Sequence, residues 1–132
     1  MTPFRFELRP GEAIFDQVVF AAKKAIVSGE LAVGQAFPSV RALAADLKIH
    51  PNTAHKAVQH LIQEKLLEVR PGIGTVVAEL PLARARERRR LLDKEIEELV
   101  VEARHLRIEL PEVVEALEAR WALMENHSRR AE

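Results

Sequence analysis

The stretch from residue 38 to residue 61 constrains the fold more than any other part of this 132-residue chain. Ser39 precedes apolar residues at helical spacing as far as Leu47, and Pro51 opens a second apolar pattern that runs to about Lys65. Serine is a favoured N-cap, and proline suits the first turn of a helix, where its missing N–H costs nothing. The three residues before Pro51 are left as a turn. The sequence therefore predicts two short helices joined by a tight turn.

The second predicted helix begins with polar and basic side chains. The N-terminal end of a recognition helix approaches base edges and phosphates most closely. The net charge is zero, but this stretch carries Arg41, Lys48 and Lys56 against Asp46 alone. An ordinary helical pair with a solvated polar end is the alternative. The candidate DNA contacts in this helix and its turn are His50, Asn52, Thr53, His55 and Lys56.

The flanking segments complete a small domain. Residues 12–28 have apolar positions three and four apart, which predicts an amphipathic helix closed by Gly29. Residues 67–70 and 75–78 read as strands on either side of a Pro/Gly turn, which predicts a hairpin. Residues 3–9 alternate apolar and charged side chains, so they are expected to form an arm or edge strand. Three helices followed by a hairpin of this length predict a winged helix.

The periodicity changes after Pro81. Apolar residues then recur at steps of four and three in two helices that are broken around residues 107–111. These seams are too short for an extended coiled coil, and a hairpin of two such helices would still expose apolar stripes. We therefore expect a homodimer. The expected interface residues are Leu92, Ile96, Leu99, Ala103, Leu106, Val114, Leu117 and Trp121.

Short blocks of sequence stand in a distinctive order: residues 14–18 (IFDQV), 28–31 (SGEL), 37–44 (FPSVRALA), 50–53 (HPNT), 64–67 (EKLL) and 72–77 (GIGTVV). With these blocks, the chain from about residue 4 to 78 resembles the GntR family of bacterial transcription regulators. The PNT turn, the short length and the two-helix tail are similar to the YtrA-like subfamily. Its members have a helical C-terminal dimerisation segment in place of a large effector domain.

The resemblance implies further roles. Arg41 would contact DNA from the second helix, and Ser39 would cap that helix and touch a phosphate. The wing would reach toward the minor groove, although Ile73 stands where a basic wing residue is common. His50 also replaces a more usual small polar residue, and Val58 a frequent aromatic one. The implied wing contacts are Gly72, Gly74 and Thr75.

Other functions find little support in the sequence. There is no cysteine, no nucleophile elbow, no P-loop and no HExxH motif, so we expect neither an enzyme nor a cofactor. His50, His55 and His60 are five residues apart, about 140° around a helix, which argues against a metal site. The first fifteen residues lack a signal-peptide pattern, and no apolar run suits a membrane helix. We therefore expect a cytoplasmic protein that does not enter membranes.

Two groups of basic residues admit more than one interpretation. Lys23 and Lys24, late in the first predicted helix, are expected to neutralise phosphates. The arginines of residues 84–90 could flank the DNA. The favoured interpretation is a solvated helix face that pairs with acidic residues in 93–98.

The predicted fold class is mainly α with a small β-hairpin. Residues 1–80 would form a winged helix–turn–helix DNA-binding domain, and residues 81–132 a helical dimerisation segment. The expected function is sequence-specific regulation of transcription, as a dimeric repressor on an inverted-repeat operator in double-stranded DNA. The alternative is a winged helix that binds proteins and not DNA. The sequence does not identify a small-molecule effector.

Overall fold

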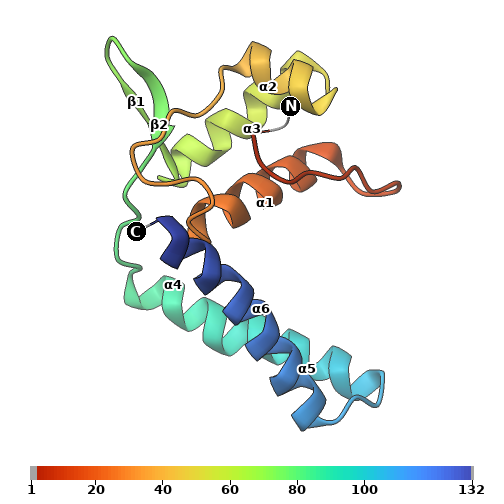
Figure 1. Cartoon of the computed structure of the whole chain (residues 1–132). Helices are drawn as coiled ribbons and strands as arrows, with labels where there is room; N and C mark the ends of the chain where they lie inside the picture. Colours follow the sequence, from red (N-terminus) through yellow and green to blue (C-terminus); the bar gives the residue numbers. More distant parts are fainter. Residues whose placement is uncertain (1–2, 132) are drawn as a thin grey trace. The chain divides into compact units, whose positions relative to one another are not determined.

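The computed structural model describes residues 3–131 and, in the last helix, side chains as far as residue 125. Its first part contains three helices and a two-stranded antiparallel hairpin (Figure 1). The predicted fold class is therefore confirmed. The elements are α1 (Ile14–Val27), α2 (Val40–Leu47), α3 (Pro51–Gln63), β1 (Leu67–Arg70) and β2 (Gly74–Val77).

The starts of α2 and α3 are fixed by local hydrogen bonds. The Ser39 hydroxyl accepts a hydrogen bond from the Ala42 backbone N–H at 3.1 Å, which caps α2 as predicted. Pro51 occupies the first turn of α3, and His50 caps this helix. The predicted bounds of α2 are confirmed.

The ends of these helices depend on left-handed residues that are not glycine. Lys48 and Lys65 have φ values of 56° and 63°. At the end of α3, the Leu66 N–H donates to the Leu61 carbonyl at 2.9 Å, and the Lys65 N–H to the Ile62 carbonyl at 3.0 Å. This pair of bonds is a Schellman motif, which satisfies carbonyls that have no partner inside the helix. Consequently α3 ends at Gln63, two residues before the predicted end.

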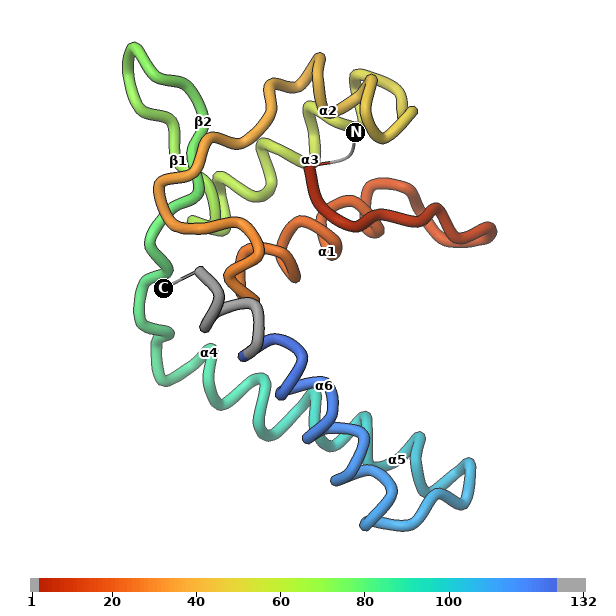
Figure 2. The backbone as a smooth tube through the Cα atoms, viewed as in Figure 1, coloured from red at the N-terminus to blue at the C-terminus, as the bar shows by residue number. Residues whose placement is uncertain are grey.

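A third segment joins the hairpin. The Phe37 N–H donates to the Thr75 carbonyl at 2.9 Å, and the Val77 N–H donates to the Gln35 carbonyl at 2.9 Å. The chain before α2 therefore runs beside β2, opposite β1 (Figure 2). These bonds cover the second edge of β2 and attach the hairpin to the helices.

The N-terminal arm is not a strand. Residues 3–9 have no regular secondary structure, so of the two expected forms the edge strand is wrong. Phe4 is buried, and its ring stacks on Phe37 with the ring centroids 6.1 Å apart. The arm is also held by Gln17, whose side chain accepts from the Arg9 N–H at 2.6 Å. The alternating pattern thus marks aromatic contacts and not strand pairing.

The core of this part lies between the three helices and the inner face of the hairpin. Apolar side chains of α1, α2, α3 and both strands are buried in one cluster. The largest side chains that are almost completely buried are Leu43, Leu61, Leu67, Val18, Val76 and Val77. This core holds α3 by one side and leaves its other side exposed.

The second part is helical. The elements are α4 (Ala85–Arg89), a π-helical stretch η1 (Arg90–Glu95), α5 (Ile96–His105) and α6 (Leu110–Ala131). The turn between α5 and α6 falls at the predicted break, with Arg107 in the left-handed region at φ 60°. By its contacts, the chain divides into one compact unit of residues 1–80 with 124–132, and a second of residues 81–123. In the part of the chain that is described, no helix is both long and apolar enough to cross a bilayer.

Candidate nucleic-acid interface

Helix α3 has two different sides. Asn52, His55 and Lys56 are exposed, and Thr53 is half-buried. The other side is packed against the core through Ala54, Ala57, Val58 and Leu61. Val58, where the family often has an aromatic residue, is therefore a packing residue. The structure brings the predicted polar residues of α3 together on one exposed face.

Helix α2 and the turn that follows it also carry exposed basic residues. Arg41 lies in the first turn of α2, and Lys48 forms the turn itself. Both side chains, like that of Lys56, are exposed, and no ion pair among the described residues involves any of the three. Lys48 is absent from the predicted contacts, although it is exposed and unpaired like the other two. Unpaired cations are available to phosphates without first breaking an internal salt bridge.

His50 has a structural role. Its Nδ1 accepts a hydrogen bond from the Asn52 backbone N–H at 3.0 Å, which caps α3. Because Nδ1 is the acceptor, only Nε2 remains for an outside contact. This explains how histidine replaces a small polar residue here: the ring does the same capping. Ser39 is likewise engaged as a cap, so its hydroxyl has one remaining hydrogen to donate.

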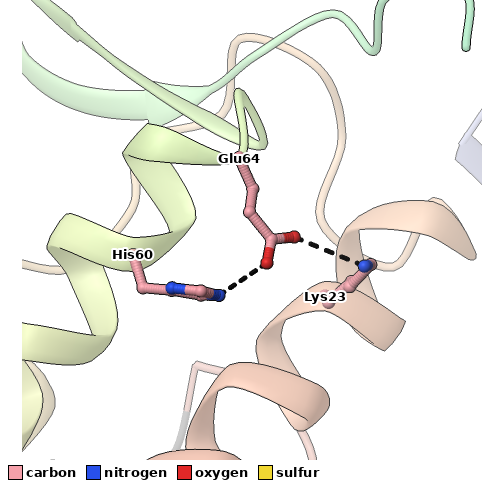
Figure 3. Close-up of polar contacts among 3 residues, drawn as sticks. All are labelled: Lys23, His60 and Glu64. Carbon is pink, nitrogen blue, oxygen red and sulfur yellow. Dashed lines mark hydrogen bonds and ion pairs between the residues drawn. The ribbon is translucent and has the colours of Figure 1, made fainter. Parts of the chain in front are cut away.

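Lys23, one of the two lysines expected to neutralise phosphates, forms an ion pair within the domain. Its Nζ lies 3.3 Å from Oε2 of Glu64, and the other oxygen of that carboxylate contacts Nε2 of His60 at 2.5 Å (Figure 3). The His60 ring also packs edge-on against Phe15, with centroids 5.5 Å apart. These contacts link α1 to the C-terminal end of α3. Lys23 is thus compensated by a carboxylate, whereas no ion pair of the described residues involves Lys24.

The hairpin tip is apolar. Ile73 is 72% exposed, and Arg70 is paired with Glu68 at 2.9 Å. Gly72 and Gly74 have φ values of 78° and 114°, and a Cβ at either position would meet no atom within 4 Å beyond the adjacent residues. These glycines are therefore required by the turn conformation and not by a close contact within the chain. Thr75 is half-buried in β2. The tip itself carries no unpaired charge.

The predicted dimer residues are mostly exposed within one chain. The exposed fraction of the residue is 37% at Ile96, 41% at Leu99 and 47% at Leu117, and it is higher at Leu92, Leu106 and Trp121. Val114 is 40% exposed. Ala103 is the exception, because it is already buried within its own chain. A group of large apolar side chains is therefore open to solvent in the second part.

The arginines of residues 84–90 are all exposed. No ion pair among the described residues joins them to the acidic positions of 93–98, so the expected pairing is absent there. The part of the chain that is described also contains no group of three His, Asp or Glu side chains placed to hold a metal ion.

Comparison with known proteins identifies the family. Residues 15–77 match the model of the bacterial regulatory proteins of the gntR family. The HTH-type transcriptional repressor YtrA of Bacillus subtilis (strain 168) is 30% identical over 108 residues, which are 81% of this chain and 83% of that protein.

Solved structures agree in fold. A protein described as a transcriptional antiterminator from Listeria monocytogenes EGD-e has a TM-score of 0.79 over 92% of both chains, at 22% identity. YtrA from Sulfolobus acidocaldarius, a GntR-family transcription factor, has a TM-score of 0.56 at 26% identity, over 74% of this chain and 97% of that one. These relatives are regulators and not enzymes. The chain belongs to the YtrA-like branch of the GntR family of transcriptional regulators and carries their winged helix–turn–helix DNA-binding domain.

Proposed function

We propose that this regulator is a dimeric repressor that binds an inverted-repeat operator in double-stranded DNA through α3. The observation that carries the proposal is the two-sided character of α3. Its buried side is fixed in the core, and its exposed side presents Asn52, His55 and Lys56. The helix and turn that precede it add the exposed, unpaired cations Arg41 and Lys48. A helix held rigidly with a polar outer face suits insertion into a major groove.

The exposed residues divide by the chemistry that each offers. Arg41, Asn52, Thr53 and His55 are the candidates for base edges, since guanidinium and amide groups match donor and acceptor pairs of bases. Lys48 and Lys56 are the candidates for phosphates, with the backbone N–H groups at the helix starts. In this assignment the Lys23–Glu64–His60 contacts orient α3, because they join its C-terminal end to α1.

Dimerisation would use the exposed seams of α5 and α6. Leu99 of α5 and Leu117 of α6 are large apolar residues of these seams, and both are exposed in the single chain. A two-fold dimer buries the same patch on both subunits and presents two copies of α3. Two recognition helices about 34 Å apart would read two half-sites one helical turn apart, so the operator would be an inverted repeat.

Similarity to a named repressor supports a repressor role for this protein. The Bacillus subtilis relative is named as a repressor. A dimer on an operator that overlaps a promoter would block polymerase physically, without a separate effector domain. The protein would act in the bacterial cytoplasm, where the chromosome is.

One observation favours a second candidate function. Val69 and Ile73 of the hairpin are 62% and 72% exposed and apolar, which suits a protein partner better than a phosphate backbone. In that case the winged helix would be a protein-interaction module without DNA binding.

Selection of bound sequences from a random pool of duplex DNA tests the proposal, with the full chain as bait. We expect an enriched inverted repeat whose affinity falls steeply with salt, because several phosphates are neutralised in each half-site. The recovered duplex, placed over a promoter in a transcription assay, should lower transcript yield. If no sequence is enriched and no salt-dependent binding to any duplex occurs, the protein-interaction function takes its place.

A further inference from the structure

The start of the second part carries a dense group of positive charge, here called the arginine segment (residues 84–90). Five of its seven residues are arginines, and Glu87 is its one acidic residue. Every residue of the segment is exposed. None of the ion pairs among the described residues involves any of its five arginines. The segment is therefore a concentrated, uncompensated cationic surface.

The position of these charges is unfavourable for the helix itself. The arginines stand at the start of the continuous helical run formed by α4, η1 and α5. The N-terminal end of a helix carries partial positive charge, so cations there repel the dipole, while anions stabilise it. The start also has no side-chain cap. Charges that oppose local stability are typical of functional surfaces. Because these charges are positive, an anionic partner would stabilise them.

The covalent chain keeps this surface close to the DNA-binding domain. Residues 78–84 have no regular secondary structure. From Val77, where β2 ends, to Arg84 is seven residues, which span at most about 25 Å. One helical turn of DNA is about 34 Å long. Arg84, the first residue of the segment, is thus confined to within about one turn of DNA from the end of β2, whichever way the two units are oriented.

We propose that the arginine segment is an accessory DNA-binding surface that contacts the phosphates flanking the sequence read by α3. This inference rests on the proposed operator binding and adds a second contact to it. Arginine binds phosphate with two parallel hydrogen bonds. Phosphate contacts carry no base information, so the segment raises affinity for any flanking sequence. In a dimer it would act on both sides of the operator.

The test compares two full-length variants that lose the same charge. R88Q/R89Q neutralises two arginines of the segment, and R104Q/R120Q neutralises two exposed arginines elsewhere in the second part. Binding to a mixed-sequence duplex of about 40 bp, roughly four helical turns, is measured by fluorescence anisotropy between about 50 and 200 mM salt. Circular dichroism and light scattering establish that fold and oligomeric state are unchanged.

For R88Q/R89Q we expect the slope of log K against log salt to flatten by about 0.9 for each arginine that meets a phosphate. The R104Q/R120Q slope should match that of the unmodified protein. Equal slopes for both variants would overturn the accessory surface and leave operator binding intact. Absence of salt-dependent DNA binding by the unmodified protein would overturn both. If R88Q/R89Q lowers binding to anionic lipid vesicles or to single-stranded RNA but leaves binding to the duplex unchanged, the accessory DNA-binding surface is also overturned.

Discussion

Lys65 closes α3 in a conformation that glycine adopts more easily. Its φ of 63° costs an L-amino acid roughly 1–2 kcal/mol relative to a right-handed residue. The side chain is exposed and makes none of the hydrogen bonds or ion pairs described for the chain. The Schellman bonds at this position use only the backbone. The strain is therefore not repaid by a side-chain contact.

Lys65→Gly should stabilise the protein. Relief of the left-handed strain exceeds the extra freedom that glycine gains in the unfolded chain, so we expect about 0.5–1 kcal/mol more stability. Urea denaturation followed by circular dichroism gives the change as a shift of the midpoint. Lys65→Ala, which removes the side chain but keeps the strain, is the control and should not show this gain. A Gly variant no more stable than the Ala variant would contradict the assignment.

Arg41→Ala should weaken operator binding by about 1–3 kcal/mol and lower the preference for the selected sequence over random DNA. The reason is its exposed, unpaired guanidinium in the first turn of α2, the helix that precedes α3. Mobility-shift titrations with both duplexes measure the two effects. Arg104→Ala removes an exposed arginine outside this interface and should keep both values. Unchanged affinity in Arg41→Ala would remove Arg41 from the interface.

At the scale of single residues, the sequence predicts where a helix begins better than where it ends. Ser39 and Pro51 have local roles that can be read without the fold, and α2 and α3 begin where they predict. Lys48 and Lys65 do not look like helix ends, because the usual signal there is glycine. Likewise nothing local reveals that Lys23 meets Glu64, since the two residues are 41 positions apart.

At the scale of elements, the hairpin has one edge covered and an apolar tip. The bonds from residues 35–37 to β2 anchor its base, while Ile73 at its tip is open. The alternation of strands and the Pro/Gly turn predict this hairpin. The sequence predicts a short extended piece before Pro38 but not its pairing with β2, because residues 34–37 lack a strand pattern and pair through their backbone alone. The N-terminal arm shows the opposite case, because its alternating pattern suggests a strand that does not form. Phe4 is buried by stacking on Phe37 and not by strand pairing.

Ile73→Lys tests whether the wing lies on DNA. The tip is exposed and has no unpaired cation, so a lysine there adds one phosphate contact if the wing meets the backbone. We expect higher affinity and a salt slope steeper by about 0.9. Leu8→Lys adds the same charge to the exposed N-terminal arm and serves as the control. Identical slopes in the two variants would place the wing tip away from DNA.

At the scale of the whole molecule, burial is distributed unevenly. Almost all buried apolar side chains belong to residues 4–78, and Ala103 is the one beyond them among the described side chains. The heptad-like pattern predicts seams in α5 and α6, but it cannot tell which positions a hairpin uses internally. Ala103 shows this difference, because it is small enough to be covered by its own chain.

Leu117→Glu should weaken dimerisation. Leu117 is 47% exposed in the single chain, and a carboxylate in a dimer seam would lose hydration and apolar burial together. We expect a loss of at least about 2 kcal/mol, roughly thirtyfold in dimer affinity. Light scattering measures the oligomeric state, and weaker operator binding should follow from lost bivalency. Ala119→Glu, exposed and outside the seam, is the control; if both variants behave alike, the seam is not the interface.

Residues 79–84 form the connection between the hairpin and the helices of the second part. They are exposed and have no regular secondary structure, and no helix or strand crosses the junction they form. A gene rearrangement that joined different coding sequences at this junction would cut neither the winged-helix core nor the helical hairpin. A different C-terminal module could then be acquired in one step, while the buried core of residues 4–78 would be inherited intact.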